Sequence, residues 1–470
     1  MRNFVKIVAA LSLALLLSSC STAQQPKAKY VFLFIGDGMG VAQVYSTEVY
    51  KAAMNGKIGH EPLSFSEFPV KSYCTTYSAN SFTTCSSAAA TAISTGVKTN
   101  NSFIGVDTDT LPIETIAEKA KKAGYKVGLM TTVAINHATP GGFYAHQPNR
   151  NMYYEIANDM LTCDFDYFAS GGFLSPTGKK KDKTNIYTLL DSAGFKVTKT
   201  IADFESLKNG DQKVVVVNPA TFGTTSHWAI DNVEGSLPLA AFVKKGIELL
   251  DNPKGFFIMC EGGKIDYACH NNDLASAIHE TIDFEKAVAE AVKFYNQHPD
   301  ETIIIVTADH ETAGLTLASS GRYSINPEWL QYQTISIDSF NVKVKNWAKQ
   351  PQKIGFENML DSLQFYFGIG NEKLPLSASE QNWLHHSYQA DFLKNKVVDP
   401  NKDYMDVSVK GLGERAIYLL NKKSGFAFAS GDHSALFVPI YALGQGQEYF
   451  KSGVDNTDIP KIIEKLMIEQ

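Results

Sequence analysis

Residues 30–35 read YVFLFI, and residues 302–308 read TIIIVTA. Both runs are apolar almost without interruption, a pattern typical of strands that are buried on both faces of a parallel sheet. Similar runs occur at 127–133 (VGLMTTV), 214–217 (VVVV) and 256–260 (FFIMC). Together they predict a mainly parallel sheet at the centre of the molecule.

Helical patterns separate these runs. Residues 111–126 and 273–298 place apolar side chains at intervals of three and four, with charged residues between them. The alternation predicts an α/β fold, in which a doubly wound, mainly parallel sheet is sandwiched by helices. From about 315 to 425 the sequence is aromatic and polar, with one helical pattern at 356–369, before a strand-like run returns at 440–444. We interpret 315–425 as a crown-like insertion into a domain that covers 30–470.

The composition excludes some classes of protein. The chain has 470 residues and 44% hydrophobic content, enough for a large core. Its 43 basic and 49 acidic side chains give a net charge of -6. The sequence has no cluster of Lys and Arg residues that could bind the phosphate backbone of a nucleic acid. We therefore expect no nucleic-acid partner.

The N-terminus resembles an export signal. Arg2 and Lys6 precede the apolar run IVAALSLALLL, which is too short to span a membrane comfortably, and LSSC at 17–20 resembles a bacterial lipobox. We predict a signal peptide at 1–19 and a tether at 20–29 that is lipidated on Cys20, so that acyl chains hold the protein on a membrane of the bacterial cell envelope, periplasmic or at the outer membrane. The alternative is an ordinary secretory signal with an incidental cysteine.

Five further cysteines remain, an odd number for a compartment that permits disulfides, so at least one thiol is expected to be free. They are Cys74, Cys85, Cys163, Cys260 and Cys269. No pair has CxxC spacing, which argues against a structural zinc knuckle or a redox motif.

Side chains that bind metals follow the predicted strands. Ligand sites in open parallel sheets form beyond the carboxyl ends of the strands. The residues of metal-ligand type at those ends are Asp37, Glu261, Asp266, His270, Asp309 and His310. One carboxylate after a strand is more often a cap or a turn residue, but a converging set of carboxylates and imidazoles predicts a cluster of divalent-metal sites.

A serine pair begins an alanine-rich segment, TTCSSAAATAISTG at 83–96, which is expected to be helical. The free amides and dipole at the start of a helix favour a serine alkoxide and a bound phosphate. In the simpler alternative, Ser86 or Ser87 only caps the helix. Cys85 is a poorer nucleophile candidate, because a thiol phosphatase needs an arginine shortly after its cysteine and Ser-Ser-Ala-Ala-Ala-Thr follows here.

Five segments resemble the alkaline phosphatase family, in the same order along nearly the whole mature chain. They are IGDGMG (35–40), ATAISTGVKT (90–99), HATPGGFYAHQPNR (137–150), TADHET (307–312) and SGDHSALFVPIYALGQG (430–446). The resemblance implies a metal-dependent enzyme that hydrolyses small phosphate monoesters with broad tolerance of the leaving group. It also implies a possible homodimer, for which the insertion is a plausible interface.

The resemblance assigns roles to individual residues. Ser86 matches the phosphorylated serine and Arg150 the substrate-binding arginine. Two zinc ions and one magnesium ion are implied as cofactors. Asp266, His270 and His433 match the ligands of one zinc; Asp37, Asp309 and His310, with the Ser86 oxygen, match those of the other; Asp37, Thr139 and Glu261 match the magnesium site.

Three residues depart from the family pattern. Cys85 stands where many members have an aspartate that orients the substrate arginine, so Arg150 is expected to hold phosphate less firmly and release it sooner. His137 and Tyr267 stand where the enteric enzyme has Asp and Lys. A histidine near the third metal leaves the identity of that metal open.

Two other functions compete with this interpretation. A related two-zinc phosphodiesterase or a sulfatase belongs to the same broad class, but a sulfatase needs Pro and Arg after its nucleophile and residues 85–91 contain neither. A non-catalytic surface lipoprotein that binds metal or phosphate is the alternative from another class. The full ligand set argues against it.

Overall fold

The computed structural model describes residues 28–319, 323–395 and 411–468. The predicted signal peptide, Cys20 and most of the tether lie outside this part of the chain. Within it, no helix has the length and apolar character needed to cross a membrane.

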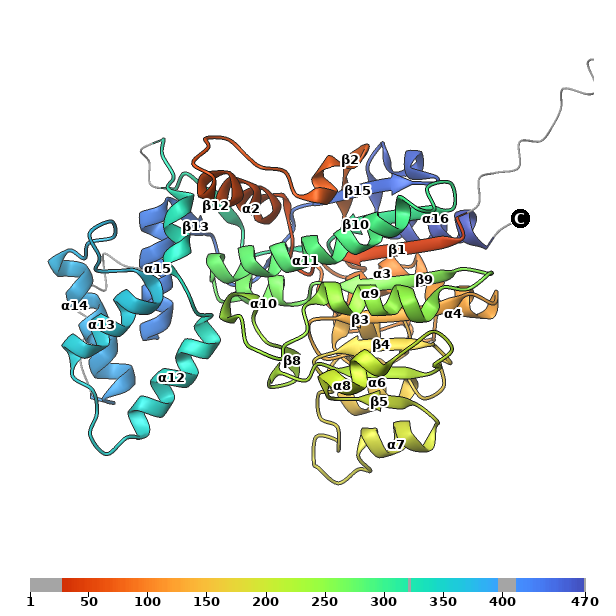
Figure 1. Cartoon of the computed structure of the whole chain (residues 1–470), viewed down its shortest axis with the longest axis horizontal. Helices are drawn as coiled ribbons and strands as arrows, with labels where there is room; N and C mark the ends of the chain where they lie inside the picture. The colour runs from red at the N-terminus through yellow and green to blue at the C-terminus, as the bar shows by residue number, and fades with distance from the viewer. Residues whose placement is uncertain (1–27, 320–322, 396–410, 469–470) are drawn as a thin grey trace, which may run out of the picture.

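A ten-stranded sheet forms the centre of the molecule (Figure 1). Its strands, in spatial order, are β16 (Val454–Asp455), β2 (Val70–Thr75), β15 (Val438–Gly444), β10 (Thr302–Thr307), β1 (Tyr30–Ile35), β9 (Phe256–Glu261), β3 (Lys126–Thr131), β4 (Tyr167–Ser170), β6 (Val214–Val217) and β5 (Lys196–Thr198). All adjacent strands are parallel except that β15 runs antiparallel to both β10 and β2. The mainly parallel sheet is thus confirmed.

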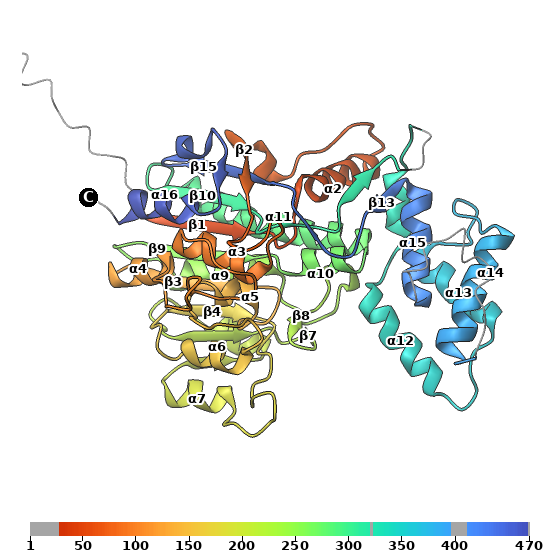
Figure 2. The same cartoon turned by 180° about the vertical axis from the view of Figure 1, so that it is seen from behind.

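Helices cover both faces of this sheet. The helices α9 (Leu239–Leu250) and α11 (Leu274–Tyr295) pack together on the face toward the viewer in Figure 1. On the opposite face, seen in Figure 2, α16 (Asp458–Met467) packs against α3 (Ser86–Thr95) and α4 (Ile116–Lys122). The predicted α/β sandwich is confirmed.

The segment between β10 and β15 leaves the sheet and forms a helical lobe at one side of it (Figure 1). The short strands β12 (Leu315–Leu317) and β13 (Phe426–Phe428) pair at its base. Its helices are α12 (Ile337–Lys349), α13 (Phe356–Phe367), α14 (Ala378–Ser387) and α15 (Leu412–Ser424). These four helices lie between the bounds of the predicted insertion, 315 and 425, and β13 lies just beyond them.

Two element boundaries differ from the expected ones for a local reason. The helix expected at 111–126 begins only at Ile116, because the Thr115 hydroxyl accepts from the Glu118 amide and the Glu118 carboxylate accepts from the Thr115 amide, a capping box. The strand expected to run to Val133 ends at Thr131, whose side chain turns to Glu261.

Candidate active site

The serine pair occupies the first turn of α3, and its two members face different neighbours. Cys85 is the N-cap, with extended backbone, and Ser86 is the first helical residue. Ser86 Oγ lies 3.3 Å from His310 Nε2, whereas Ser87 Oγ lies 3.1 Å from Cys85 Sγ. Of the two serines, Ser86 is therefore the one that joins the predicted ligand cluster.

Asp37, Asp309 and His310 converge beyond the carboxyl ends of β1 and β10. His310 Nε2 lies 3.4 Å from Asp37 Oδ1 and 3.2 Å from Asp309 Oδ2. All three side chains are buried, and their ligand atoms are close enough to hold one metal ion. The amides of Gly38 and His310 donate to Asp309 Oδ1, which leaves Oδ2 directed at the cluster.

Gly38 is required for this approach. It has a φ of 73°, and a Cβ there would lie 2.8 Å from Thr312 Oγ1 and 2.9 Å from the Asp266 backbone. Only glycine combines this backbone conformation with such close neighbours. The second glycine of IGDGMG thus lets the loop after β1 reach the helix that carries Asp266.

A second group joins Asp266 and His270 of α10 (Lys264–His270) to His433 of β14 (His433–Ser434). His270 Nε2 lies 3.2 Å from both Asp266 Oδ2 and His433 Nε2. His433 comes from far along the chain because β14 pairs with β11 (Glu311–Thr312). The His433 ring stacks on His310 with centroids 3.5 Å apart, so the two groups adjoin.

Thr139 and Glu261 lie beside Asp37 on another side of the cluster. Thr139, in the short helix α5 (Ala138–Gly141), places Oγ1 3.4 Å from Asp37 Oδ2. Glu261 is the last residue of β9, fully buried, and accepts a hydrogen bond from the Thr131 hydroxyl. Asp37 thus borders both this group and the one that contains His310.

The electrostatics of the cluster favour bound cations. Burial and repulsion from neighbouring carboxylates raise the pKa of Asp37 well above its usual range and that of Asp309 to about 8, and burial raises the pKa of Glu261 to about 7. Asp37 Oδ1, Asp309 Oδ2 and Glu261 Oε1 are buried without a hydrogen-bond partner among the described residues. Because unpaired buried anions are costly, these oxygens fit a site for divalent metal ions.

In the second group, of Asp266, His270 and His433, the imidazoles stabilise the charge of the carboxylate. Burial raises the pKa of Asp266, but the hydrogen bond from His270 and the neighbouring imidazoles outweigh it and hold the pKa well below its usual value. The same hydrogen bond raises the pKa of His270 to about 9. Asp266 is thus an ionised carboxylate surrounded by three imidazoles. One of them, His310, also belongs to the first group.

Arg150 lies near these groups without a carboxylate partner. It forms no ion pair within the described chain, and its Nη2 lies 3.4 Å from His137 Nε2. The Tyr267 hydroxyl approaches the same nitrogen at 3.3 Å. Burial, followed by the charge of Arg150, lowers the pKa of His137 to about 3, so this imidazole is neutral.

The hydrogen bonds of the Cys85 thiol are with groups other than Arg150. Its sulfur lies 3.1 Å from Ser87 Oγ and accepts from the Ser102 amide at 3.1 Å. Burial raises the pKa of Cys85, but hydrogen bonds with the Ser87 hydroxyl and with the Ser102 and Ala88 backbone, together with the charge of Arg150, outweigh burial and set the pKa below its ordinary value. All five described cysteines are free thiols.

The sequence model of the alkaline phosphatase family matches residues 28–170 and 175–468. The chain belongs to the alkaline phosphatase family. It is 31% identical to alkaline phosphatase 3 of Bacillus subtilis (strain 168), over 94% of this chain and 90% of that protein. The family makes the chain a phosphatase, a phosphoric monoester hydrolase.

Solved alkaline phosphatases share the fold. The cold-active enzyme from Shewanella sp. superposes with a TM-score of 0.78 at 26% identity and covers 94% of this chain and 100% of its own. Alkaline phosphatase from the Antarctic bacterium TAB5 superposes with a TM-score of 0.65 at 26% identity, covering 95% and 100%. A variant of the TAB5 enzyme with a histidine changed to aspartate is described with Mg bound in its M3 site.

Several contacts that organise the alkaline phosphatase site were not predicted. The Thr312 hydroxyl lies 2.5 Å from Asp266 Oδ1 and 3.2 Å from His310 Nδ1, linking the two ligand groups. The carbonyls of Thr84 and Gly431 lie 2.9 Å from His433 Nδ1 and 2.6 Å from His270 Nδ1. Such partners orient ligand imidazoles and fix their tautomers. Thr312 is the last residue of the TADHET segment, and its closeness in sequence to Asp309 and His310 was the available signal.

Proposed function

We propose that this alkaline phosphatase hydrolyses phosphate monoesters to an alcohol and inorganic phosphate through a phosphoserine at Ser86. The observation that carries the proposal is the placement of the Ser86 hydroxyl at the start of α3 and 3.3 Å from His310 Nε2. There it meets the free amides of the first helical turn, which favour a phosphoryl group. Ser87, turned to Cys85, has no such position.

We propose two zinc ions and one magnesium ion as cofactors. Asp37, Asp309 and His310, with the Ser86 oxygen, would hold one zinc; Asp266, His270 and His433 would hold the other; Asp37, Thr139 and Glu261 would hold magnesium. Metal ions of this kind, when bound, supply Lewis-acid chemistry that lowers the pKa of oxygen nucleophiles and neutralises charge on phosphoryl and leaving oxygens.

At the third site we propose magnesium although His137, which lies close to Tyr267 and Arg150, is neutral and offers no carboxylate. The TAB5 variants that carry Asp or Glu in place of a histidine are described with Mg bound in the M3 site. By analogy, we propose that His137→Asp would strengthen magnesium binding in this chain. Isothermal titration of the zinc-loaded protein with Mg²⁺ tests this, and equal affinity in both proteins would contradict it.

The chain's own residues act in two displacements. Arg150 binds two nonbridging oxygens of the ester through its guanidinium fork and fixes the phosphoryl group for attack. Ser86 Oγ forms a bond to phosphorus as the bond to the ester oxygen breaks; the serine gives up its proton and the departing alcohol gains one. A water then attacks phosphorus from the side that the alcohol has left, and the phosphorus–Oγ bond breaks. Inorganic phosphate is released, and Ser86 Oγ regains a proton, which restores its hydroxyl.

Hydrolysis of p-nitrophenyl phosphate and bis-p-nitrophenyl phosphate by zinc- and magnesium-loaded protein tests the proposal. We expect monoester turnover that is lost on chelation and in Ser86→Ala, with ³²P from labelled substrate trapped on Ser86 by acid quenching. Ser87→Ala is the matched control and should retain most activity. Preference for the diester, or full activity of Ser86→Ala, would show that the substrate class or the nucleophile is wrong. A metal-loaded protein inert toward both esters would point to a non-catalytic role.

We also propose that the chain is an exported lipoprotein of the bacterial cell envelope, anchored through Cys20. The support is the N-terminal sequence, where a basic start, an apolar run and LSSC occur in order. Metabolic labelling with palmitate should mark the wild-type chain and leave Cys20→Ser unlabelled, with the variant released into the soluble fraction. Labelling of both proteins would contradict the anchor.

A further inference from the structure

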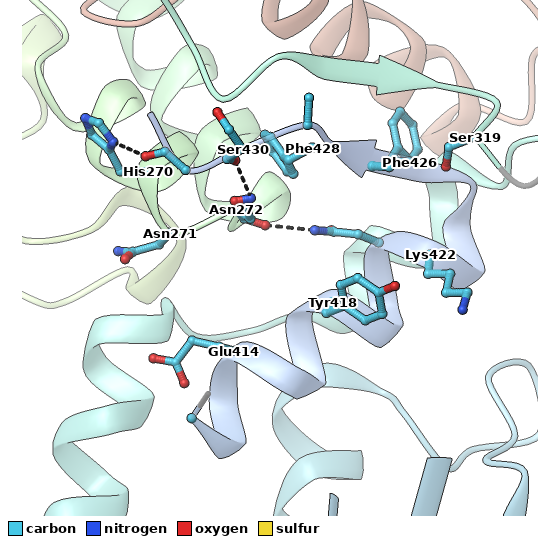
Figure 3. A pocket seen from close by; sticks show the side chains of 15 residues that line it. His270, Asn271, Asn272, Ser319, Glu414, Tyr418, Lys422, Phe426, Phe428 and Ser430 are labelled. Carbon is cyan, nitrogen blue, oxygen red and sulfur yellow. Dashed lines mark hydrogen bonds between the residues drawn. The ribbon is translucent and has the colours of Figure 1, made fainter. Parts of the chain in front are cut away.

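A cavity of about 610 Å³ lies between the end of α10 and the helix α15 of the lobe (Figure 3). His270, Asn271 and Asn272 line it from the core, and Glu414 and Tyr418 line it from α15. Its volume is that of a pocket for a small organic molecule. The mechanism above assigns no role to this cavity or to the lobe that closes it.

Contacts connect the cavity to Ser86. Ser86 Oγ adjoins His310, the His310 ring stacks on His433, and His433 Nε2 lies 3.2 Å from His270 Nε2. His270 therefore belongs both to the candidate active site and to the wall of the cavity, and the Gly431 carbonyl that orients it is a second lining group. Along this series of contacts, His270 and the cavity that it lines are the farthest from Ser86.

This position matters because the displacement at phosphorus is in line. When Ser86 attacks from one side, the ester oxygen departs from the other, away from the serine. In the proposed mechanism, the alcohol attached to that oxygen then extends toward His433 and His270. The cavity beyond His270 is where a bulky alcohol would lie.

The lining has the chemistry of a site for a neutral, hydroxyl-rich molecule. Asn271 is exposed, and its side chain makes no hydrogen bond within the described chain, so both its donors and its acceptor are available. The rings of Tyr418 and Phe428 offer flat apolar surfaces between these polar groups, as Figure 3 shows. The lining carries charged groups of both signs, Glu414 on one side and Lys422 and His270 on the other, so it is not matched to an alcohol of a single charge.

We propose that this cavity is a leaving-group subsite for hydroxyl-rich alcohols, and that sugar phosphates are the preferred monoesters. The inference rests on the proposed function and adds the substrate class to it. Sugar hydroxyls bind the amide and carboxylate groups of Asn271 and Glu414, while the C–H face of the ring packs on Tyr418. The lobe residues of α15 thereby contribute to substrate choice although none of them is in the ligand cluster.

The experiment compares glucose 6-phosphate with methyl phosphate, whose leaving group is too small to enter the cavity. The readout is the ratio of the two kcat/KM values for the wild type, Asn271→Leu and Tyr418→Leu. We expect the ratio to fall about tenfold in each variant, the loss typical of one hydrogen bond or one ring contact. Asn296→Leu is the matched control, because Asn296 caps the end of α11 as Asn271 caps α10 and lies outside the cavity. Its ratio should equal that of the wild type.

The outcomes separate the two proposals. If both esters are hydrolysed and neither variant changes the ratio, the subsite is wrong and the phosphatase mechanism stands. If neither ester is hydrolysed by metal-loaded protein, both proposals fail. If adenosine 5′-phosphate, included as a third substrate, responds to the variants while glucose 6-phosphate does not, the assignment to sugars is overturned in favour of nucleosides. Saturation-transfer NMR of glucose 6-phosphate on Ser86→Ala gives a binding readout independent of turnover, and its signal should weaken in Ser86→Ala/Tyr418→Leu.

Discussion

Lys264, the first residue of the helix that carries Asp266 and His270, forms a buried ion pair with Glu280, with Nζ 3.6 Å from Oε1. Burial lowers the pKa of Lys264 to about 8 and raises that of Glu280 to about 7. The ammonium also donates to the Ser226 carbonyl at 2.9 Å and lies 3.9 Å from the centre of the Trp228 ring. The pair therefore fixes the first turn of α10 to α11 at the base of the site.

Lys264→Met should lower the free energy of unfolding by about 3 to 5 kcal/mol, because it leaves the Glu280 carboxylate buried and unpaired. The double variant Lys264→Met/Glu280→Leu should recover part of that loss. Urea denaturation at pH 7.5 measures both. The exposed pair Lys293–Glu290 is the control, and Lys293→Met should cost less than about 0.5 kcal/mol. A double variant less stable than Lys264→Met alone would show that the charges attract more than their burial costs.

Arg150→Ala should lower kcat/KM for p-nitrophenyl phosphate by roughly 10²-fold or more and weaken inhibition by inorganic phosphate, since the guanidinium positions the phosphoryl oxygens. Arg150→Lys keeps the charge but loses the bidentate geometry of the guanidinium, so its activity should lie between that of the wild type and that of Arg150→Ala. Steady-state kinetics with added phosphate measures these effects. Unchanged phosphate inhibition in Arg150→Ala would remove Arg150 from the substrate site.

Cys85 should react with iodoacetamide at pH 8 before the other described thiols. Its hydrogen bonds lower its pKa, whereas burial raises the pKa of Cys163 to about 12, and thiolate fraction controls alkylation. Both side chains are half-buried, so Cys163 is a control of similar access. Time-resolved labelling followed by peptide mass spectrometry measures the order. Faster modification of Cys163 would mean that access, and not pKa, decides reactivity.

The buried strands were the part of the fold that local sequence could predict. YVFLFI, VVVV and FFIMC each form a strand, because continuous apolar runs have few alternatives to a two-sided core. The antiparallel direction of β15 could not be predicted, since it depends on the return of the chain from the lobe. Strand β2 was not predicted, because its short sequence VKSYCT, near the sheet edge, alternates between buried and more exposed residues and contains no continuous apolar run.

The residues of the site also differ in how far local sequence could predict them. Glu261 is the last residue of β9, and Asp37 and Asp309 lie two residues beyond the ends of β1 and β10, so the topology of a parallel sheet brings them together. His433 reaches the site only through the pairing of β14 with β11, more than a hundred residues away in sequence, and nothing local marks it. Only the family resemblance singled it out. The Thr312 link between the two ligand groups shows that orienting contacts need the folded geometry.

Removal of metal should make stability fall as pH rises. Burial and mutual repulsion raise the pKa of Asp309 to about 8, and burial raises that of Glu261 to about 7, from ordinary values of 3.8 and 4.5. Between the ordinary and the raised values the folded state binds more protons than the unfolded state, so each rise in pH favours unfolding there. Their contribution is fully present below about pH 4 and is lost as pH rises through about 8.

Differential scanning calorimetry of chelated protein at pH 5.5 and 8.5 measures this loss, and reconstitution with zinc and magnesium should abolish most of it because bound cations stabilise the ionised carboxylates. Asp309→Asn is the matched variant: it removes one buried acid of nearly the same size, so its chelated form should lose less stability between the two pH values than the chelated wild type. The comparison also separates charge from packing, since both proteins fill the space beyond β10 almost equally. An identical pH dependence in the two chelated proteins would mean that carboxylate repulsion in this cluster does not limit the stability of the metal-free fold.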